Sequence, residues 1–204
     1  MNDNFNLILA SNSPQRKKLL KDDGFNFTVY PSQLEEKVDS KWDPVTCVKE
    51  LAKQKAKAII EKIWQSNNIE YLQKNSVILA ADTVAAINKE IFGKPNDYDD
   101  AYKMLWKLSR NRHMVITGVC LWPLIRKEPI IDVDITYITM RHMKKEEIKN
   151  YINSKESYGK AGAYAIQSKA DKFVEKIEGN FDNVVGLPLK LVHQLLEQWE
   201  KARI

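Results

Sequence analysis

Asp82 has the clearest chemical signature in this chain. It stands in the segment VILAADTVAAI, where small or apolar residues precede it and, after Thr83, follow it. A carboxylate in such surroundings is unfavourable unless something compensates its charge. Ligand sites in open α/β sheets gather at the ends of buried strands, and an acid there commonly binds a metal or acts as a base. The alternative is an aspartate that only caps a turn.

A second group of candidates lies in the stretch LILASNSPQRKKLL. A helix that begins at Pro14 has unpaired amide N–H groups and the positive end of its dipole there, so it favours an anion. Ser11 and Ser13 add hydroxyl groups, and Arg16 and Lys17 add positive charge in the first turn. The pattern predicts a phosphate site. The alternative is Ser13 as a simple N-cap, with both cations solvated.

Lys55 falls on the face of an expected helix that should be buried. At about 100° per residue, it shares one stripe of the helix 44–63 with Val48, Ala52 and Ile59. A buried ammonium group needs a partner. Either the long side chain extends along the edge of the core to water, or Lys55 points into a cleft and meets phosphate.

Acidic and sulfur-containing residues limit where a metal can bind. Glu35 and Glu36 follow the strand-like FNFTVY and a proline-containing turn, so they could bring a second carboxylate to a metal at Asp82. By itself, a Glu-Glu pair on a loop is usually solvated surface.

Cys47 and Cys120 form no CxxC pattern and have no histidine at ligand spacing, so we expect both to be core residues.

The elements that must position these residues are strands and helices in alternation. The apolar runs NLILA and NSVILAA are typical of strands buried on both faces, which implies a sheet covered by helices. HMVITGVCLW and IIDVDITYITM carry β-branched residues, and the alternation in DVDITYIT predicts an antiparallel strand. The fold class is therefore α/β or α+β with a mixed sheet. Helical patterns are expected over 14–24, 44–63, 97–109, 145–153 and 188–201, with caps or initiating prolines at Ser13-Pro14, Asp43-Pro44, Asp97 and Leu187-Pro188.

Length and composition limit the class of protein. With 204 residues, 44% of them hydrophobic, the chain 1–204 is expected to form a single large domain or two small lobes. The apolar runs are far shorter than the roughly 20 residues that span a bilayer, and the N-terminus has no signal-like pattern, so we expect a cytoplasmic protein. The net charge of +5 suits a polyanionic partner such as nucleic acid or nucleotide phosphates. No GxxxxGK[ST] or GxGxxG motif occurs, which argues against a kinase-like or dinucleotide-binding fold.

Several segments, taken in order, resemble the signatures of the Maf family of nucleoside triphosphate pyrophosphatases. They are LILASNSPQRKKLL, LEE, LAKQKA, AADTV, GKP, LS followed by VITGV, KAGAYAIQ and IEGNFDNVVGLPL, and they cover nearly the whole chain. The resemblance implies an enzyme that depends on a divalent cation, Mg²⁺ or Mn²⁺, and cleaves a nucleoside triphosphate to the monophosphate and pyrophosphate. It also implies a homodimer and a two-lobed α/β fold, a twisted mixed sheet with flanking helices and the site in a cleft between the lobes.

The resemblance also implies phosphate-binding residues. It places Ser11, Ser13 and Arg16 at the triphosphate, with Lys55 and Lys94 beside them. Hydrolysis at an α-phosphorus needs positive charge around the phosphate oxygens, a metal, and a base that orients water in line with the departing pyrophosphate. Arg16, Lys55 and Lys94 would supply part of that positive charge.

The remaining roles implied by the resemblance concern catalysis and base recognition. Glu36 and Asp82 match acidic site residues and, with Lys94, form the expected catalytic set. We expect Asp82 to be the base and Glu36 the principal metal ligand, and the reverse assignment stays open. Thr83 and Gln167 match positions that help to recognise the nucleobase.

According to the resemblance, the residues at the positions of Thr83 and Gln167 differ between subgroups of the family. Members that resemble dTTP/UTP enzymes carry Thr and Gln there, as this chain does, whereas the subgroup associated with 7-methyl-GTP tends to carry Gln and Glu. A glutamine amide offers both a donor and an acceptor to a uracil or thymine edge, whereas a glutamate would favour a cationic methylated guanine. Two positions depart from the pyrimidine pattern: Gln15 stands where an arginine is usual, and Gly159 where an aspartate often precedes Lys-Ala-Gly.

Two other functions stay open besides the dTTP/UTP and 7-methyl-GTP alternatives. One is an inosine-triphosphate type of pyrophosphatase, which cleaves the same bond with a deaminated purine bound. The other is a nucleic-acid-binding or cell-division regulatory protein on the same fold, whose salt-sensitive binding would survive the loss of Asp82.

Overall fold

A computed structural model describes residues 5–32, 34, 36–66, 75–167 and 169–202. Its centre is a mixed sheet of seven strands in the order β2-β1-β3-β5-β6-β7, with β4 pairing to β3 beside this path. Strand β1 runs parallel to β2 and β3, and the other neighbours are antiparallel. The predicted mixed α/β sheet is thus confirmed. The strands are β1 (Asn6–Leu9), β2 (Phe27–Val29), β3 (Ser76–Ile87), β4 (Glu90–Phe92), β5 (Arg112–Pro123), β6 (Ile130–Met140) and β7 (Val174–Glu178).

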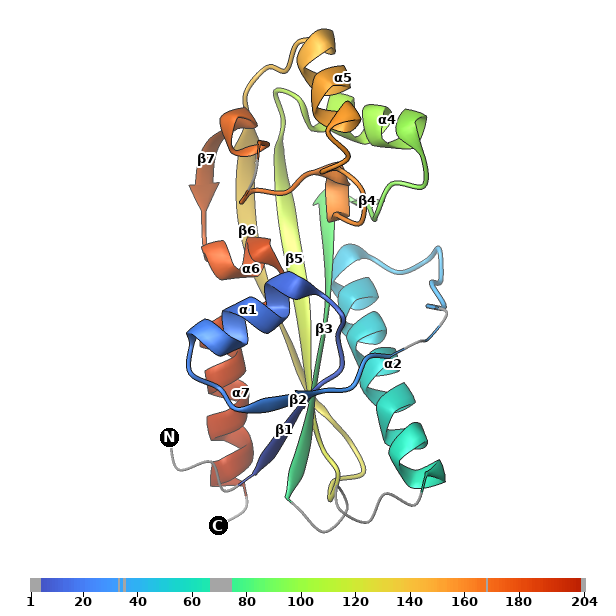
Figure 1. Cartoon of the computed structure of the whole chain (residues 1–204), viewed down its shortest axis with the longest axis vertical. Helices are drawn as coiled ribbons and strands as arrows, with labels where there is room; N and C mark the ends of the chain where they lie inside the picture. Colours follow the sequence, from blue (N-terminus) through green and yellow to red (C-terminus); the bar gives the residue numbers. More distant parts are fainter. Residues whose placement is uncertain (1–4, 33, 35, 67–74, 168, 203–204) are drawn as a thin grey trace.

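Helices flank this sheet (Figure 1). All five predicted helices are confirmed, and each begins and ends within two residues of its expected range. Short elements late in the chain were not predicted, because a single turn carries little periodic signal. The helices are α1 (Pro14–Asp22), α2 (Pro44–Gln65), α4 (Tyr98–Leu108), α5 (Lys145–Asn153), α6 (Phe181–Val185) and α7 (Leu189–Lys201), and the 3₁₀ turns are η1 (Ala161–Ala163) and η2 (Asp171–Phe173).

The long strands β3, β5 and β6 join two groups of helices (Figure 1). Helices α1, α2 and α7 lie around one half of these strands, and α4 and α5 lie at the other end. The second group has a core of its own, in which Leu105, Tyr151 and Phe173 are buried. This arrangement matches the expected two lobes, and the central cleft between them stays a prediction.

Strand β3 is buried on both faces, and its side chains alternate between them. Val77, Leu79 and Ala81 belong to the cluster that contains the apolar face of α7. Ile78 and Ala80 pack with the apolar face of α2. Because the side-chain period of a strand is two, the next residues along β3 also leave on opposite faces of the sheet.

The two cysteines are buried and unpaired, as expected for core residues. Burial raises the pKa of the Cys47 thiol to about 11 and that of Cys120 to about 12, so both stay protonated at neutral pH. In the described part of the chain, no helix combines the length and the apolar character needed to span a bilayer.

Gly118 allows helix α2 to approach the sheet closely. It pairs with Asp82 across β5 and β3, and a Cβ atom at Gly118 would lie 2.6 Å from both the backbone carbon and the carbonyl oxygen of Val48. Backbone atoms cannot give way as a flexible side chain can. Any side chain at this position must therefore push α2, which carries Lys55, away from the strand that carries Asp82.

Replacing Gly118 with alanine is expected to lower the free energy of unfolding by about 1 to 3 kcal/mol, because the added methyl group overpacks the contact between α2 and β5. Urea denaturation of the variant and the wild type measures the difference. The matched control is Gly93→Ala, where an added methyl group meets nothing within 4 Å. Equal stability of Gly118→Ala and the wild type would mean that α2 does not depend on this close approach.

Candidate active site

The candidate site lies at an open stretch of the edge of β3. Strand β1 pairs with β3 as far as Leu79, and β4 begins to pair with the same edge at Ala85. Among the described residues, no strand covers this edge between those two positions. Asp82 and Thr83 lie in this interval, Asp82 on the α2 face and Thr83 on the opposite face.

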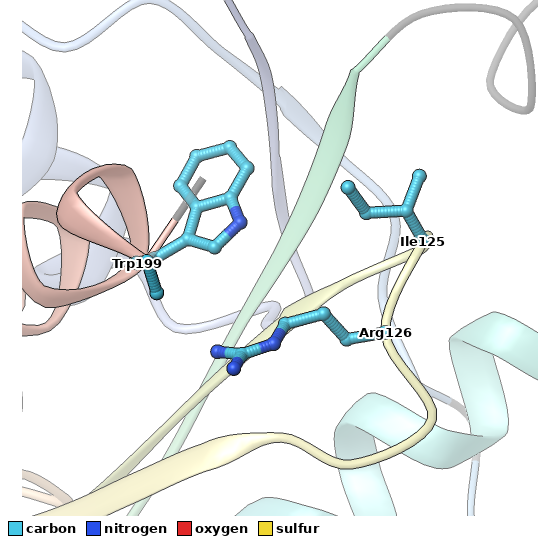
Figure 2. A pocket seen from close by; sticks show the side chains of 4 residues that line it. Ile125, Arg126 and Trp199 are labelled. Atoms are coloured by element: carbon cyan, nitrogen blue, oxygen red, sulfur yellow. The ribbon is translucent and has the colours of Figure 1, made fainter. Parts of the chain in front are cut away.

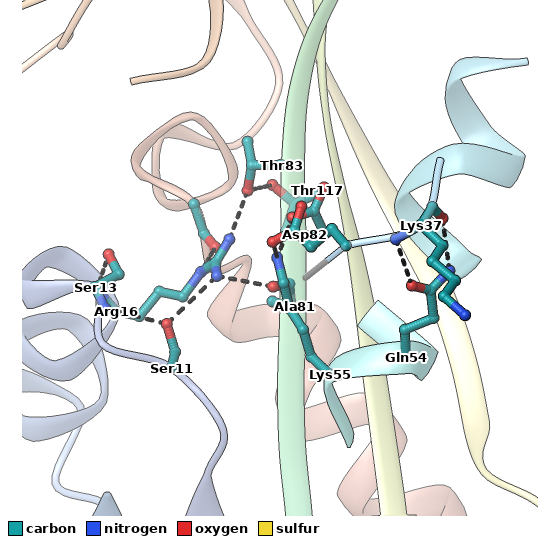
Figure 3. Close-up of polar contacts among 12 residues, drawn as sticks. Ser11, Ser13, Arg16, Lys37, Gln54, Lys55, Ala81, Asp82, Thr83 and Thr117 are labelled. Carbon is teal, nitrogen blue, oxygen red and sulfur yellow. Dashed lines mark hydrogen bonds and ion pairs between the residues drawn. The ribbon is translucent and has the colours of Figure 1, made fainter. Parts of the chain in front are cut away.

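Two carboxylates converge on the ammonium group of Lys55, and Figure 3 shows Lys55 beside one of them, Asp82. Lys55 Nζ lies 2.9 Å from Glu36 Oε1 and also contacts Asp82 Oδ1. The Lys55 and Asp82 side chains are 12% and 11% exposed, and that of Glu36 is 37% exposed. Lys55 thus lies on the buried stripe predicted for it, but its partners are the two acids, which neither sequence-based alternative named.

A tether between the loop after β2 and helix α2 positions Glu36. The Lys37 N–H donates to Gln54 Oε1 at 3.1 Å, and Gln54 Nε2 donates to the Lys37 carbonyl at 2.9 Å. Gln54 immediately precedes Lys55, so the tether brings Glu36 to the lysine. Glu35, the other candidate of the pair, lies outside the described residues.

Arg16 joins three segments of the chain at the open edge (Figure 3). Its Nε donates to the Gly186 carbonyl at 2.8 Å, one terminal nitrogen donates to the Ala81 carbonyl at 2.8 Å, and the other donates to Thr83 Oγ1 at 3.0 Å. A longer contact of 3.5 Å reaches Ser11 Oγ. Four of the five N–H donors of the guanidinium are therefore used within the chain, which makes Arg16 a structural clamp of the site.

Electrostatics also link Arg16 to the acidic pair. Burial lowers the pKa of the Arg16 guanidinium, and the nearby carboxylates of Asp82 and Glu36 oppose that shift. The three charged groups therefore lie within electrostatic reach of one another, although Arg16 contacts β3 on the Thr83 side. Its predicted contact with a triphosphate stays a prediction.

The serine hydroxyls before α1 take part in the turn that starts the helix. Ser13 Oγ accepts the Arg16 N–H at 3.4 Å, so Ser13 is an N-cap. The sequence-based alternative that expected this cap also expected a solvated Arg16, and that part is wrong, because the guanidinium is bound within the chain. Ser11 Oγ accepts the Ser13 N–H at 3.1 Å, and the Ser13 hydroxyl donates to Gln15 Oε1 at 3.2 Å. Gln15 therefore supports this turn, at a position where related pyrimidine-type enzymes are expected to carry an arginine.

A polar network behind Thr83 was missed by the sequence analysis. Thr83 Oγ1 lies 3.0 Å from Thr117 Oγ1, and the Thr117 hydroxyl donates to the Asn183 carbonyl at 3.0 Å. Asn183 Nδ2 in turn donates to the Val115 carbonyl at 2.9 Å and to Thr136 Oγ1 at 3.0 Å. The network connects the open edge of β3 to α6. Asn183, the polar first residue of the otherwise apolar segment NVVGLPL, was the signal in the sequence that could have indicated this network.

Two other predicted residues lie in the described chain without a contact to this group. Lys94, just after β4, and Gln167, after η1, are both exposed. Within the described residues, no hydrogen bond or ion pair joins either to Asp82, Glu36 or Lys55. Their roles beside the triphosphate and the nucleobase stay predictions.

A cavity of about 260 Å³ elsewhere in the molecule has a different character (Figure 2). Ile125, Arg126, Trp199 and Ala202 line it, at the β5–β6 connection and the end of α7. No carboxylate is among these lining residues, and the cavity lies beside the start of β3 instead of at its open edge. It offers no acid or base for the chemistry expected at Asp82.

Replacing Arg16 with lysine is expected to lower the free energy of unfolding by about 2 to 4 kcal/mol, because one ammonium group cannot satisfy the Ala81 and Gly186 carbonyls and Thr83 together. Chemical denaturation measures this loss. Lys17→Met is the control, since it removes a neighbouring positive charge that has no part in the clamp. A lysine variant as stable as the wild type would contradict the clamp.

The fold and the site together define an α/β protein in which a lysine ammonium group lies between two carboxylates at an open edge of the sheet. Comparison with known proteins adds the family. The model of the family described as Maf-like protein matches residues 6–199. The chain therefore belongs to the Maf family, as the order of its motifs indicated.

Relatives named for an activity match this chain along most of their length. The dTTP/UTP pyrophosphatase of Alkaliphilus oremlandii (strain OhILAs) is 44% identical over 183 residues, which are 90% of this chain and 90% of that protein. The dTTP/UTP pyrophosphatase of Carboxydothermus hydrogenoformans is 42% identical over 193 residues, 95% of this chain and 98% of that protein. That of Caldicellulosiruptor saccharolyticus is 40% identical over 192 residues, 94% of each chain.

Proposed function

We propose that this Maf protein hydrolyses dTTP and UTP to the nucleoside monophosphate and pyrophosphate. The observation that carries the proposal is the convergence of Asp82, Glu36 and Lys55 at the open edge of β3. The carboxylates of this centre can act as a base, and the Lys55 ammonium group supplies positive charge within a few ångströms of them. Hydrolysis of a phosphoanhydride requires both. Relatives that are 40% to 44% identical and bear the name dTTP/UTP pyrophosphatase support the choice of substrate.

In the proposed reaction, a water molecule attacks the α-phosphorus. Lys55 binds Asp82 through Oδ1, so Oδ2 is the oxygen that accepts the proton from the water. The bond between the α-phosphorus and the oxygen that bridges to the β-phosphorus breaks, and pyrophosphate leaves with the bonding electron pair. Lys55 and Lys94 contribute positive charge toward the phosphate oxygens, and Arg16 holds the turn after β1 beside β3.

The residues present fit a divalent cation at this centre. Carboxylate oxygens from two separate elements already meet at one cationic group, the Lys55 ammonium. Within the described residues, no group of three or more His, Cys, Asp or Glu side chains is arranged to hold a metal. Mg²⁺ commonly binds through one or two carboxylates with water and substrate phosphates, so Glu36 and Asp82 would hold Mg²⁺ or Mn²⁺, which would offset charge on the triphosphate.

We propose Thr83 and Gln167 as residues that select the base. Arg16 and Thr117 fix the Thr83 hydroxyl, which gives it a defined position. Gln167 is exposed on the segment that follows η1, and its amide offers one donor and one acceptor face to a pyrimidine edge. A 7-methyl-GTP or ITP preference is the alternative that the substrate assay below decides.

The test is a panel of nucleoside triphosphates incubated with the protein and Mg²⁺ or Mn²⁺, with monophosphate, pyrophosphate and orthophosphate measured separately. The proposal expects monophosphate and pyrophosphate from dTTP or UTP. Preference for 7-methyl-GTP or ITP would contradict the base assignment. Release of orthophosphate would contradict attack at the α-phosphorus. Salt-sensitive binding of DNA or RNA without turnover would favour the nucleic-acid-binding alternative.

We further propose that the protein acts as a cytoplasmic homodimer, as the resemblance to the family implies. Light scattering coupled to size-exclusion chromatography measures the assembly: a mass of about twice 23.6 kDa is expected, and a mass of one chain would contradict the dimer.

A further inference from the structure

Two lysines come together on the same edge of β3 as the acidic centre. Strand β4 runs antiparallel to β3, with Phe92 paired to Ala85. Residues after Phe92 therefore move along β3 in the direction of Asp82, which is three positions before Ala85. Lys94 is the second residue on this path.

The turn η1 brings Lys160 to the same place. The Gly162 N–H donates to the Gly93 carbonyl at 3.0 Å. Gly162 has φ +66°, and a Cβ atom there would lie 3.0 Å from the Cβ of Ala85, so the turn packs directly on β3. Lys160 precedes Gly162 by two residues, and its carbonyl accepts the Ala163 N–H at 3.1 Å. Backbone contacts thus fix both lysines relative to the open edge.

The charges of this pair are not neutralised within the described chain. Lys160 is half-buried, whereas most surface lysines here form ion pairs or extend into water. Among the described residues, neither Lys94 nor Lys160 has a carboxylate partner. Burial lowers the pKa of Lys160, and the positive charge of Lys94 lowers it further. Two adjacent cations of which one is partly desolvated are unfavourable unless an anion binds between them.

We propose that Lys160 binds the terminal phosphates of the substrate together with Lys94, and that this pair holds the pyrophosphate product. The inference rests on the proposed function and adds a residue to it. The polyphosphate end is the assigned ligand because it carries the negative charge of the substrate, whereas a pyrimidine base is neutral. Lys160 therefore acts in binding and not in proton transfer.

The test measures inorganic pyrophosphate in two ways, by calorimetric binding to the whole protein and by inhibition of dTTP hydrolysis. Lys160→Met is expected to weaken pyrophosphate binding and to raise KM for dTTP by about 10- to 100-fold, with kcat changed much less. Lys160→Arg should restore most of the affinity, because it keeps the charge. Lys160→Gln repeats the test if the methionine variant does not fold.

The control is Lys169→Met on the same segment, where the lysine lies on the surface and pairs with Glu156 at 3.1 Å. It removes one positive charge without altering the proposed pair, so its pyrophosphate affinity should equal that of the wild type. Unchanged affinity in Lys160→Met, or the same loss in Lys169→Met, would overturn the inference. Failure of the wild type to hydrolyse any triphosphate would instead overturn the proposed function, and pyrophosphate calorimetry separates the two results.

Discussion

Asp82→Asn is expected to lower kcat for dTTP hydrolysis by about two to four orders of magnitude. An asparagine keeps the shape of the side chain but cannot accept the proton of the attacking water, and a positioned base contributes an effect of this size. It also leaves Lys55 with Glu36 as its single carboxylate partner. KM should change less, because Glu36, the expected principal metal ligand, and the cations proposed to bind the phosphates are unchanged.

The measurement is steady-state kinetics on variants whose fold is verified by circular dichroism and urea denaturation. Glu36→Gln should also lose most of the activity, since it removes the second carboxylate of the centre. Asp132→Asn is the matched control, because Asp132 is an exposed residue on β6. Wild-type kcat in both Asp82→Asn and Glu36→Gln would rule out the proposed mechanism.

Lys55→Met is expected to lower the free energy of unfolding by about 2 to 4 kcal/mol. Removing one partner of a buried ionic group leaves its counter-charge uncompensated, and here two carboxylates would face each other. The effect should lie below that of a fully buried pair, because the Glu36 side chain is 37% exposed and water screens it. Activity should fall as well, since the phosphate oxygens lose a positive charge.

Thermal melts with and without Mg²⁺, at equal ionic strength, distinguish this account from simple loss of packing. Mg²⁺ should raise the Tm of Lys55→Met more than that of the wild type, because a divalent cation can take the place of the ammonium between the carboxylates. The control is Lys57→Met, two residues further along α2, where the lysine is exposed and lies 3.8 Å from Glu61. An identical response to Mg²⁺ in Lys55→Met and the wild type would mean that the two acids do not form a cation site.

Much of the fold could be predicted because its signals are local. Helix periods, the caps Ser13, Asp43 and Asp97, and the apolar run of β3 each depend on neighbours within a few residues. The stripe on α2 likewise predicted that Lys55 is buried and needs a partner. In these cases, no knowledge of the tertiary arrangement was required.

The composition of the site could be predicted only in part, because its contacts cross between distant segments. Whether Lys55 meets water, phosphate or carboxylate depends on where β3 and the loop after β2 place Asp82 and Glu36. The Arg16 clamp depends on Gly186, which is 170 residues away along the chain. Gly118 is required by the approach of a helix backbone, which leaves no pattern in the local sequence.

Hydrolysis of dTTP in water labelled with ¹⁸O, followed by mass spectrometry of both products, tests the central claim most directly. If the centre formed by Asp82, Glu36 and Lys55 directs water to the α-phosphorus, the label will appear in dTMP and not in pyrophosphate. Label in pyrophosphate, with unlabelled dTMP, would show that water attacks the β-phosphorus and would contradict the account.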